Sequence, residues 1–303
     1  MSESGRPLAN QLGMSQPLAQ EIPKIVWIYW DSGVDAAPEV VRLCVESWKR
    51  LNPDWEVRVL SDANRQNWVD LENLIPRYGE LPIQKRANLL RKRLLATYGG
   101  VWADATVLCV KPLSTWLPMA PAEGFLLFYN QAPDRYICNW FIGATPNSPF
   151  MLEWFKRNAE YFRGKNLRPP QGFYKTIHEA LRKYTTRSRR RVRFWTSWFG
   201  TTVWKTYPYF ISHYLAAEIL YHDKRFSGVL QRNPLLRQPF PLSLKERMRT
   251  YKDEFSVAFL RDLDAGVAPM FKLNKLQTTP EGAAVARCLS EIQDWIERQD
   301  RQK

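Results

Sequence analysis

The chain has 303 residues, a formal net charge of +14 and 45% hydrophobic residues. This composition excludes an intrinsically disordered protein, and the length allows one large core. No charged leader followed by an apolar stretch occurs, nor an apolar run of transmembrane length, so we expect a protein made and kept in the cytoplasm. Four cysteines without C-x-x-C spacing predict reduced core thiols rather than disulfides or zinc ligands.

The first third of the chain alternates strand and helix patterns. Residues 1–20 are polar and lack periodicity, so we expect them to be flexible. Residues 24–30 are a nearly unbroken apolar run, typical of a buried parallel strand. A helix is predicted over 38–50 and a short strand over 56–60, separated by an Asn-Pro-Asp turn. The alternation predicts an α/β layer with right-handed crossovers.

The central run, residues 83–113, contains charges at positions where apolar residues are expected. Leu90, Leu94 and Tyr98 fall on the apolar side of a helix that ends at a Gly-Gly pair, and Arg91 lies among them. The next strand, predicted over 101–108, places Asp104 among apolar residues. The remaining cations of the helix are predicted to face solvent: Lys85, Arg86, Lys92 and Arg93.

Arg91 and Asp104 allow two interpretations. They can form a buried ion pair that ties helix to strand, or they can bind a ligand. Within a strand, Asp104 and Thr106 would project from the same side. Two oxygen-bearing side chains near the end of a strand suit a divalent cation and a diphosphate, and sheets of this kind bind ligands beyond the carboxyl ends of their strands.

The second half has a more mixed pattern. It predicts strands near 124–129 and 140–143, a helix over 149–162 and a last helix over 280–299. Neither G-x-G-x-x-G nor G-x-x-x-x-G-K-[ST] occurs, which argues against a dinucleotide dehydrogenase or a P-loop enzyme. G-x-S-x-G is absent too and histidines number three, so no serine hydrolase is indicated. His213, in an aromatic cluster, is predicted to be a packed, hydrogen-bonded core residue, with contact to a ligand as the less favoured alternative.

Part of the positive charge is concentrated in residues 182–193, RKYTTRSRRRVR. A solvated basic loop is the ordinary meaning of such a run. It would also attract an anionic membrane surface or an acidic polysaccharide. Nucleic acid is a weaker alternative, because no recognition motif accompanies the charge.

Several blocks along the chain resemble one family. In order they read IPKIVWIYW (22–30), SWKRLNPD (47–54), NLLR (88–91), GGVWADAT (99–106), NWFIGA (139–144), YFISHY (209–214) and KLNK (272–275). Their order and spacing resemble the capsular polysaccharide synthesis glycosyltransferases, a bacterial branch of the DXD-sugar-binding group related to glycosyltransferase family 32. Two departures stand out: Asn88 replaces the acid that usually precedes the arginine, and Thr106 replaces the second acid of the DXD motif.

The resemblance implies a GT-A type α/β fold. A single catalytic domain over 21–303 would follow the flexible residues 1–20. Its nucleotide-sugar-binding, Rossmann-like half would cover about 21–123, and its mixed acceptor half 124–303. The implied activity is that of a hexosyltransferase of the EC 2.4 class, which moves a sugar from a UDP-sugar to a glycan or lipid-linked acceptor in surface polysaccharide synthesis, with retention of anomeric configuration. Such an enzyme would work in the cytoplasm, peripheral to the inner face of the membrane.

The resemblance also implies residue roles. Asp104 and Arg91 would be catalytic, and Asp104 and Thr106 would hold Mn²⁺ or Mg²⁺. The donor-binding residues would be Trp27, Asn64, Asn88, Arg91, Trp102, Asp104, Thr106, Asn139, Lys272 and Lys275. Each has a structural alternative: Trp27 as a core residue, Asn64 in a segment capped by Asp62, and the lysines as surface residues. A non-catalytic nucleotide-sugar or acidic-glycan binding protein is the alternative function, because Asn88 and Thr106 weaken the metal site.

Overall fold

The structure is a computed structural model. It describes residues 20–121, 123–132, 135–163, 171–204, 206–232, 255–273 and 282–301. The predicted flexible segment, residues 1–20, lies outside this description except for its last residue. Among the described helices, none has the length and apolar character needed to cross a membrane.

A five-stranded sheet with the order β2-β1-β3-β6-β5 forms the centre of the fold. β1 (Ile25–Tyr29) pairs in parallel with β2 (Glu56–Leu60) and with β3 (Gly100–Ala103). β6 (Arg135–Ala144) runs antiparallel to β3 and pairs with β5 (Phe125–Ala132). A mixed sheet with a parallel half confirms the predicted α/β class and is consistent with a GT-A type fold.

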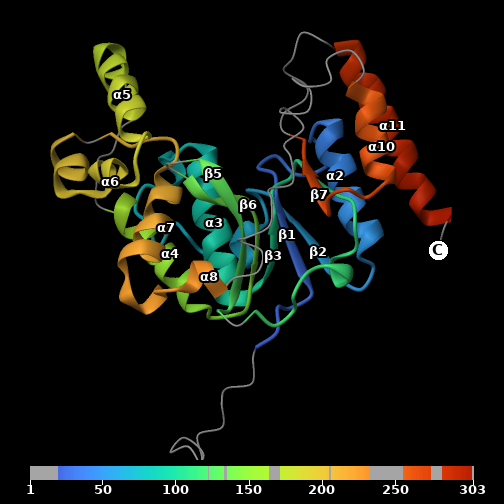
Figure 1. The fold of residues 1–303 in the computed structure, drawn as a ribbon, viewed down its shortest axis with the longest axis horizontal. Helices are drawn as coiled ribbons and strands as arrows, with labels where there is room; N and C mark the ends of the chain where they lie inside the picture. The colour runs from blue at the N-terminus through green and yellow to red at the C-terminus, as the bar shows by residue number, and fades with distance from the viewer. Residues whose placement is uncertain are drawn as a thin grey trace, which may run out of the picture.

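Helices cover both faces of the sheet (Figure 1). On one side lie α2 (Glu39–Leu51), α10 (Phe255–Asp264) and α11 (Gly282–Arg301). On the other lie α3 (Ile83–Tyr98), α4 (Pro149–Phe162) and α7 (Ile211–His222). Each layer buries its own apolar cluster against the sheet. The helices predicted over 38–50, 149–162 and 280–299 are therefore confirmed. Cys44, Cys109 and Cys138 are buried thiols outside any disulfide, as predicted.

The end of α3 is fixed by two glycines. Gly99 has φ +66 and its N–H donates to Leu95 O, while Gly100 has φ +91. A Cβ added at Gly100 would lie 2.7 Å from the carbonyl oxygen of Ile25, so only glycine allows β3 to approach β1 this closely.

The prediction that Lys85 and Lys92 face solvent is wrong, because they are 3% and 0% exposed.

The single strand predicted over 101–108 is also wrong, because the chain turns at residues 104–106. β3 ends at Ala103, and β4 (Val107–Cys109) joins a second sheet with β7 (Met270–Lys272). In that antiparallel pair Val107 lies opposite Lys272. The turn therefore brings a lysine from near the end of the chain to Asp104.

Shorter helices complete the fold. The basic run is helical rather than a loop: it covers the end of α5 (Gly172–Thr185), the single turn α6 (Arg189–Val192) and the start of the 3₁₀ turn η4 (Arg193–Thr196). A π-helical turn, η5 (Phe199–Val203), and the short α8 (Val229–Arg232) lie in the same half. The other 3₁₀ turns are η1 (Arg65–Asn67), η2 (Tyr78–Glu80), η3 (Leu113–Thr115) and η6 (Lys224–Phe226).

Candidate functional site

A cavity of about 850 Å³ lies at the carboxyl ends of β1 and β3. This is the edge at which parallel sheets with crossover helices bind ligands. Its wall combines the residues after β1, one side of α3, the turn after β3, the middle of β6, the segment before α7 and β7. The lining residues are Tyr29, Trp30, Asp31, Ile83, Gln84, Ala87, Asn88, Arg91, Trp102, Asp104, Ala105, Thr106, Cys138, Asn139, Trp140, Tyr209, Phe210, His213 and Lys272.

The Asp104 carboxylate accepts three hydrogen bonds at this site. Its Oδ1 accepts from Arg91 Nη2 and from Trp102 Nε1, each at 2.9 Å. Its Oδ2 accepts from Lys272 Nζ at 2.8 Å. The backbone N–H of Asp104 donates to Trp140 O at 2.8 Å, which fixes the turn against β6. Arg91, Asp104 and Lys272 are here called the Asp104 cluster.

The Asp104 cluster carries an excess of positive charge. Burial alone would raise the pKa of Asp104, but the charges of Lys272 and Arg91 and the hydrogen bonds of Lys272 and Trp102 outweigh it and lower that pKa. The carboxylate is therefore ionised at neutral pH. One carboxylate faces two cations, and the side chains of all three are at least partly shielded from water, with 26%, 6% and 15% exposed for Asp104, Arg91 and Lys272. Such an arrangement favours an anionic ligand in the cavity.

Arg91 is held from several sides. Its Nη1 donates to Asn139 O, and its guanidinium lies over the ring of Trp102, 4.9 Å from the ring centroid. Asn139 Nδ2 donates to Asn88 Oδ1 at 3.0 Å. The two amide side chains and the guanidinium thus form a continuous polar wall beside Asp104. Groups of this kind recognise sugar hydroxyls, because they offer both donors and acceptors.

The residues at this site do not fit the predicted divalent cation. Both oxygens of Asp104 already accept from cations or an indole. Thr106 lies in the turn, only 8% exposed, and contributes a neutral hydroxyl. In the described part of the chain, no group of three or more His, Cys, Asp or Glu side chains is placed to bind a metal. Mg²⁺ and Mn²⁺ favour several hard oxygen ligands, carboxylates above all.

Two of the predicted donor-binding residues that the structure describes, Trp27 and Asn64, do not line the cavity. Trp27 is fully buried, its Nε1 donates to Gly99 O at 2.9 Å, and its ring packs on Trp68, so it is the core residue of the alternative interpretation and the predicted donor-binding role is wrong. Asn64 does not line the cavity either, because its Oδ1 accepts the N–H of Ser61 at 2.8 Å. Lys275 lies outside the described residues. The other seven predicted residues line the cavity together.

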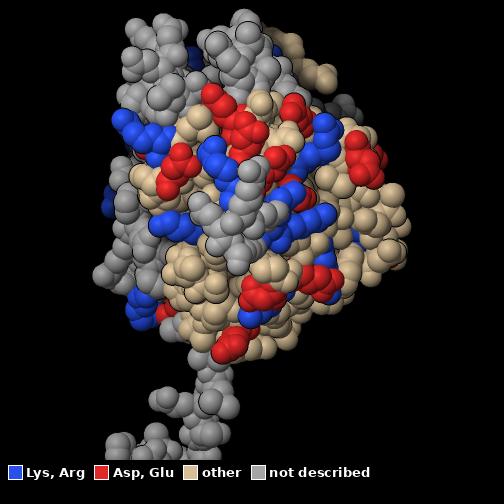
Figure 2. All heavy atoms as spheres, turned by 90° about the vertical axis from the view of Figure 1, so that its right-hand side faces the viewer, with Lys and Arg blue, Asp and Glu red and all other residues tan. Residues whose placement is uncertain are grey.

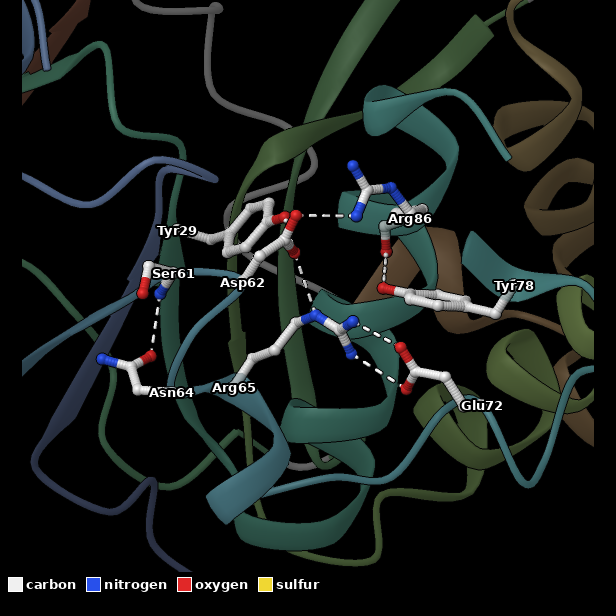
Figure 3. Close-up of polar contacts among 8 residues, drawn as sticks. All are labelled: Tyr29, Ser61, Asp62, Asn64, Arg65, Glu72, Tyr78 and Arg86. Carbon is white, nitrogen blue, oxygen red and sulfur yellow. Dashed lines mark hydrogen bonds and ion pairs between the residues drawn. The ribbon is translucent and has the colours of Figure 1, made fainter. Parts of the chain in front are cut away.

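Beside the cavity lies a second polar cluster, which the sequence did not indicate (Figure 3). Asp62 Oδ1 accepts from Tyr29 Oη at 2.7 Å and from Arg65 Nε at 3.0 Å, and its Oδ2 accepts from Arg86 Nη1 at 2.7 Å. Arg65 also pairs with Glu72. These five residues, here called the Asp62 cluster, tie the end of β1 to the first turns of α3. Asp62 therefore positions the cavity residue Tyr29 rather than capping a helix.

The segment before α7 and the first turn of that helix supply a part of the cavity wall to which the sequence pattern assigned no ligand. Tyr209, Phe210 and His213 line the cavity, so His213 is not simply a packed core residue. Lys85 Nζ donates to Pro208 O at 3.3 Å and to Tyr209 O, which anchors this segment to α3. The YFISHY block held the signal, because it recurs at the same place in the family pattern, but no chemistry in it pointed to a ligand.

Comparison with known proteins identifies sugar transfer as the common activity of the relatives. A family model described as "Capsular polysaccharide synthesis protein" matches residues 8–191. "Glycosyltransferase afumC" of Aspergillus fumigatus is 29% identical over 48% of this chain and 42% of its own length. "Initiation-specific alpha-1,6-mannosyltransferase" of Candida albicans is 22% identical over 51% and 41%. "Inositol phosphoceramide mannosyltransferase 1" of Schizosaccharomyces pombe is 27% identical over 47% and 46%.

These matches cover less than half the length of each relative named. The three are fungal, whereas the sequence resemblance implied a bacterial branch. A solved structure, "PaToxG Glycosyltransferase", superposes with a TM-score of 0.39 at 15% identity, over 48% of this chain and 62% of that one.

Proposed function

The chain belongs to the capsular polysaccharide synthesis protein family, and on that premise we propose that it is a glycosyltransferase. It would move a sugar from a nucleoside-diphosphate donor, UDP-linked in our proposal, to a glycan or lipid-linked acceptor. The observation that carries the proposal is the Asp104 cluster: an ionised carboxylate with two cations at the sheet edge, inside a cavity of about 850 Å³. The relatives named above, each a glycosyltransferase by its printed name, support the same activity.

In this proposal the donor lies across the Asp104 cluster. The diphosphate takes the place beside Lys272 and Arg91, where the excess positive charge lies. Asp104 accepts hydrogen bonds from hydroxyls of the sugar or the ribose, as it now accepts from Trp102. Asn88 and Asn139, which already bond each other at 3.0 Å, offer amide donors and acceptors to the same sugar.

The chemical barrier is the departure of a nucleoside diphosphate from a sugar with oxocarbenium character. Negative charge grows on the leaving diphosphate, so fixed positive charges that face it lower the barrier. Lys272 and Arg91 supply two such charges. One preorganised donor of this kind contributes about 3–4 kcal/mol to transition-state stabilisation. Retention of the anomeric configuration, which we propose from the family resemblance, requires the acceptor to enter from the side of the leaving group.

No step of this proposal depends on a metal ion. A Mn²⁺ or Mg²⁺ would neutralise charge on the diphosphate if it were bound, but the described donor set does not fit one. We propose instead that the two cations of the Asp104 cluster carry the charge of the leaving group. Nucleotide binding in the presence of a chelator tests this directly.

The acceptor and the place of action are proposals as well. One of the relatives named above is called an inositol phosphoceramide mannosyltransferase. For this chain we propose a surface polysaccharide or a lipid-linked glycan, reached at the cytoplasmic face of an anionic membrane. The basic residues between 182 and 193 support that location through their charge.

A panel of UDP- and GDP-sugars, with release of the nucleoside diphosphate as the readout, tests the proposed activity. We expect release with one donor by the wild-type chain and its loss in Asp104→Asn, whose fold is checked by circular dichroism. The rival function is a binding protein that has kept the cavity without turnover. Nucleotide binding by calorimetry without release from any donor would favour that rival, and absence of both would reject the proposal.

A further inference from the structure

Most of the large apolar side chains that are exposed among the described residues belong to one part of the chain. The described residues include nine large hydrophobic side chains that are exposed, and two of them, Leu152 and Val267, lie elsewhere. The other seven belong to α5, η5 and the segments around them: Phe173, Tyr174, Tyr184, Trp198, Phe199, Val203 and Tyr209. Phe173 is 76% exposed and Trp198 72% exposed. Exposed apolar side chains that gather in one region mark a contact surface rather than random scatter.

One side of α5 packs on the rest of the protein, and another side is exposed to solvent. His178 Nδ1 lies 2.9 Å from Thr206 Oγ1, and Thr185 Oγ1 accepts from Trp195 Nε1 at 2.8 Å. These two residues are seven apart and mark the inner side. At 100° per residue, Phe173, Ile177, Ala180 and Tyr184 fall on a different side. Figure 1 shows α5 standing out from the rest of the fold.

The aromatic residues of η5 lie close to this helix. The ring of Tyr174 in α5 meets that of Trp204, just after η5, with centroids 6.3 Å apart. Phe199 in η5 packs on Phe194 with centroids 5.8 Å apart. α5 is thus in ring contact with the residue that follows η5, and η5 is in ring contact with η4. We call the exposed aromatic residues of the two elements, Phe173, Tyr174, Tyr184, Trp198 and Phe199, the aromatic surface.

The charge around the aromatic surface has one sign. Residues 172–203 contain eight Lys and Arg against one Glu. Arg190 and Arg191 lie in α6 and are exposed. On the face formed by α2, α10 and α11, by contrast, Lys and Arg alternate with Asp and Glu (Figure 2). There Arg298 pairs with Asp264 at 3.5 Å.

We propose that the aromatic surface docks on an anionic lipid bilayer, with its rings at the level of the headgroups. Trp, Tyr and Phe favour this interface, because their apolar bodies enter the acyl boundary. Lys and Arg beside them are attracted to anionic headgroups. An acidic polysaccharide would explain the charge but not the exposed phenylalanines. Charge and exposed rings together therefore select a bilayer over a soluble polyanion.

The position of the surface also bears on the acceptor, and this part rests on the proposed function. Tyr209 is 60% exposed and lines the cavity. α5 extends from the fold on the side toward which β1 and β3 point (Figure 1). A bilayer bound to the aromatic surface would lie on the same side of the molecule as the cavity. A lipid-linked acceptor in that bilayer could then reach the donor.

Vesicle co-sedimentation with the full chain tests the docking. We expect binding to vesicles of phosphatidylcholine with 30% phosphatidylglycerol, and binding at least tenfold weaker to phosphatidylcholine alone. Trp198→Ser/Phe199→Ser should weaken binding to the anionic vesicles about tenfold. Leu152→Ser/Val267→Ser, which removes exposed apolar residues elsewhere, should leave it unchanged. Arg190→Glu/Arg191→Glu should weaken it and reduce its dependence on salt.

Two results would overturn the proposal. One is no binding to anionic vesicles by a wild-type chain with a folded circular dichroism spectrum. The other is a loss of binding in the arginine variant while the Trp198→Ser/Phe199→Ser variant binds as the wild type does, which would indicate charge attraction without insertion of the rings. The assay needs no sugar donor. Failure of vesicle binding therefore leaves the donor assay unaffected, and failure of sugar transfer leaves the docking result unaffected.

Discussion

The Asp104 cluster and the Asp62 cluster are built from the same kinds of groups, but they differ in net charge and in their position relative to the cavity. In each, one carboxylate accepts hydrogen bonds from two cationic side chains and from one aromatic residue. The Asp62 cluster also includes Glu72, which pairs with Arg65 (Figure 3). Two acids then balance two arginines. In the Asp104 cluster one acid faces two cations.

This difference in charge agrees with the position of each cluster. The balanced Asp62 cluster joins β1 to α3 and needs nothing further to satisfy its charges. The Asp104 cluster lines a cavity and has one positive charge left for a ligand. A buried ion pair is therefore weak evidence for function by itself. The excess charge and the open space beside it distinguish a binding site from a structural link.

The sharpest test of this comparison replaces each aspartate by asparagine. Asp104→Asn removes the charge that holds Arg91 and Lys272 and the acceptor proposed for the sugar. We expect turnover to fall about 100-fold or more and the free energy of unfolding to fall by about 3 kcal/mol, because two cations lose their counter-charge. Asp62→Asn should cost about 1–2 kcal/mol of stability and change turnover less than about threefold. Nucleoside diphosphate release and urea denaturation measure both effects.

An equal loss of turnover in the two variants would break the comparison, because it would make Asp62 as important for the reaction as Asp104. The two substitutions are matched in size and in chemistry, so general destabilisation is controlled within the pair. Temperature is set below the unfolding transition of the less stable variant.

The next largest effect is expected at Lys272. Lys272→Met keeps the length of the side chain and removes its charge. The affinity for UDP should fall about 10- to 100-fold, since a charge-assisted hydrogen bond contributes about 1.5–3 kcal/mol. Lys24→Met is the matched control, because Lys24 is exposed and pairs with Asp54 far from the cavity. Calorimetry with UDP measures both.

The same measurement settles whether the cations replace a metal. We expect wild-type affinity for UDP to be equal in EDTA and in Mn²⁺. The opposite result would be a UDP affinity that rises more than tenfold with Mn²⁺ and falls only slightly in Lys272→Met. It would show that a metal ion, and not Lys272, neutralises the charge of the diphosphate.

The sequence was a good guide to local structure and to the residues near Asp104. Hydrophobic periodicity located β2 and the helices α2, α3 and α4, because the apolar residues of each element recur at the period of a strand or of a helix. Arg91 and Asp104 stood out as charges on apolar sides, and the structure brings them together. Family blocks far apart in the chain added Asn139 and Lys272.

What the sequence could not show depends on contacts between distant segments. The turn after Ala103 is fixed by pairing of β4 with β7, a strand about 160 residues later. Lys85 and Lys92 look like solvent-facing cations by spacing, but α4 and the segment before α7 cover that side of α3. The Asp62 cluster combines four short segments, none of which has a distinctive pattern.

A smaller effect is expected at Asn88, where the family pattern has an acid. Asn88 Oδ1 accepts from Asn139 Nδ2 at 3.0 Å. Asn88→Ala leaves that amide without its acceptor beside the proposed sugar, so kcat/KM should fall about tenfold. Asn88→Asp keeps an acceptor and should stay within about threefold of the wild type. If both variants behave alike, the bond between the two amides does not organise the site.

The last effect is on stability rather than on turnover, and it concerns the buried lysine that anchors the cavity wall. Burial lowers the pKa of Lys85 to about 7 from its ordinary 10.5. Its Nζ lies among the carbonyls of Pro208 and Tyr209 and the rings of Tyr207 and Tyr209. Between pH 7 and pH 10 the unfolded chain therefore holds more protons at this position than the folded chain does. Stability must then rise with pH across that window, and this group contributes no slope below it.

Lys85→Met should remove that contribution. The slope of the free energy of unfolding against pH should be shallower in the variant by at most about 1.4 kcal/mol per pH unit between pH 7 and 10. The pKa of Lys92 is lowered by burial and by the charges of Arg91 and Lys85. The difference between the two proteins therefore reports the titration of Lys85 together with its repulsion of Lys92. Urea denaturation at half-unit steps of pH, with Lys24→Met as control, measures it. Parallel curves of the free energy of unfolding against pH for wild type and Lys85→Met would mean that Lys85 titrates alike in the folded and unfolded chain. The contact of Lys85 with the backbone of Tyr209 would then not depend on pH.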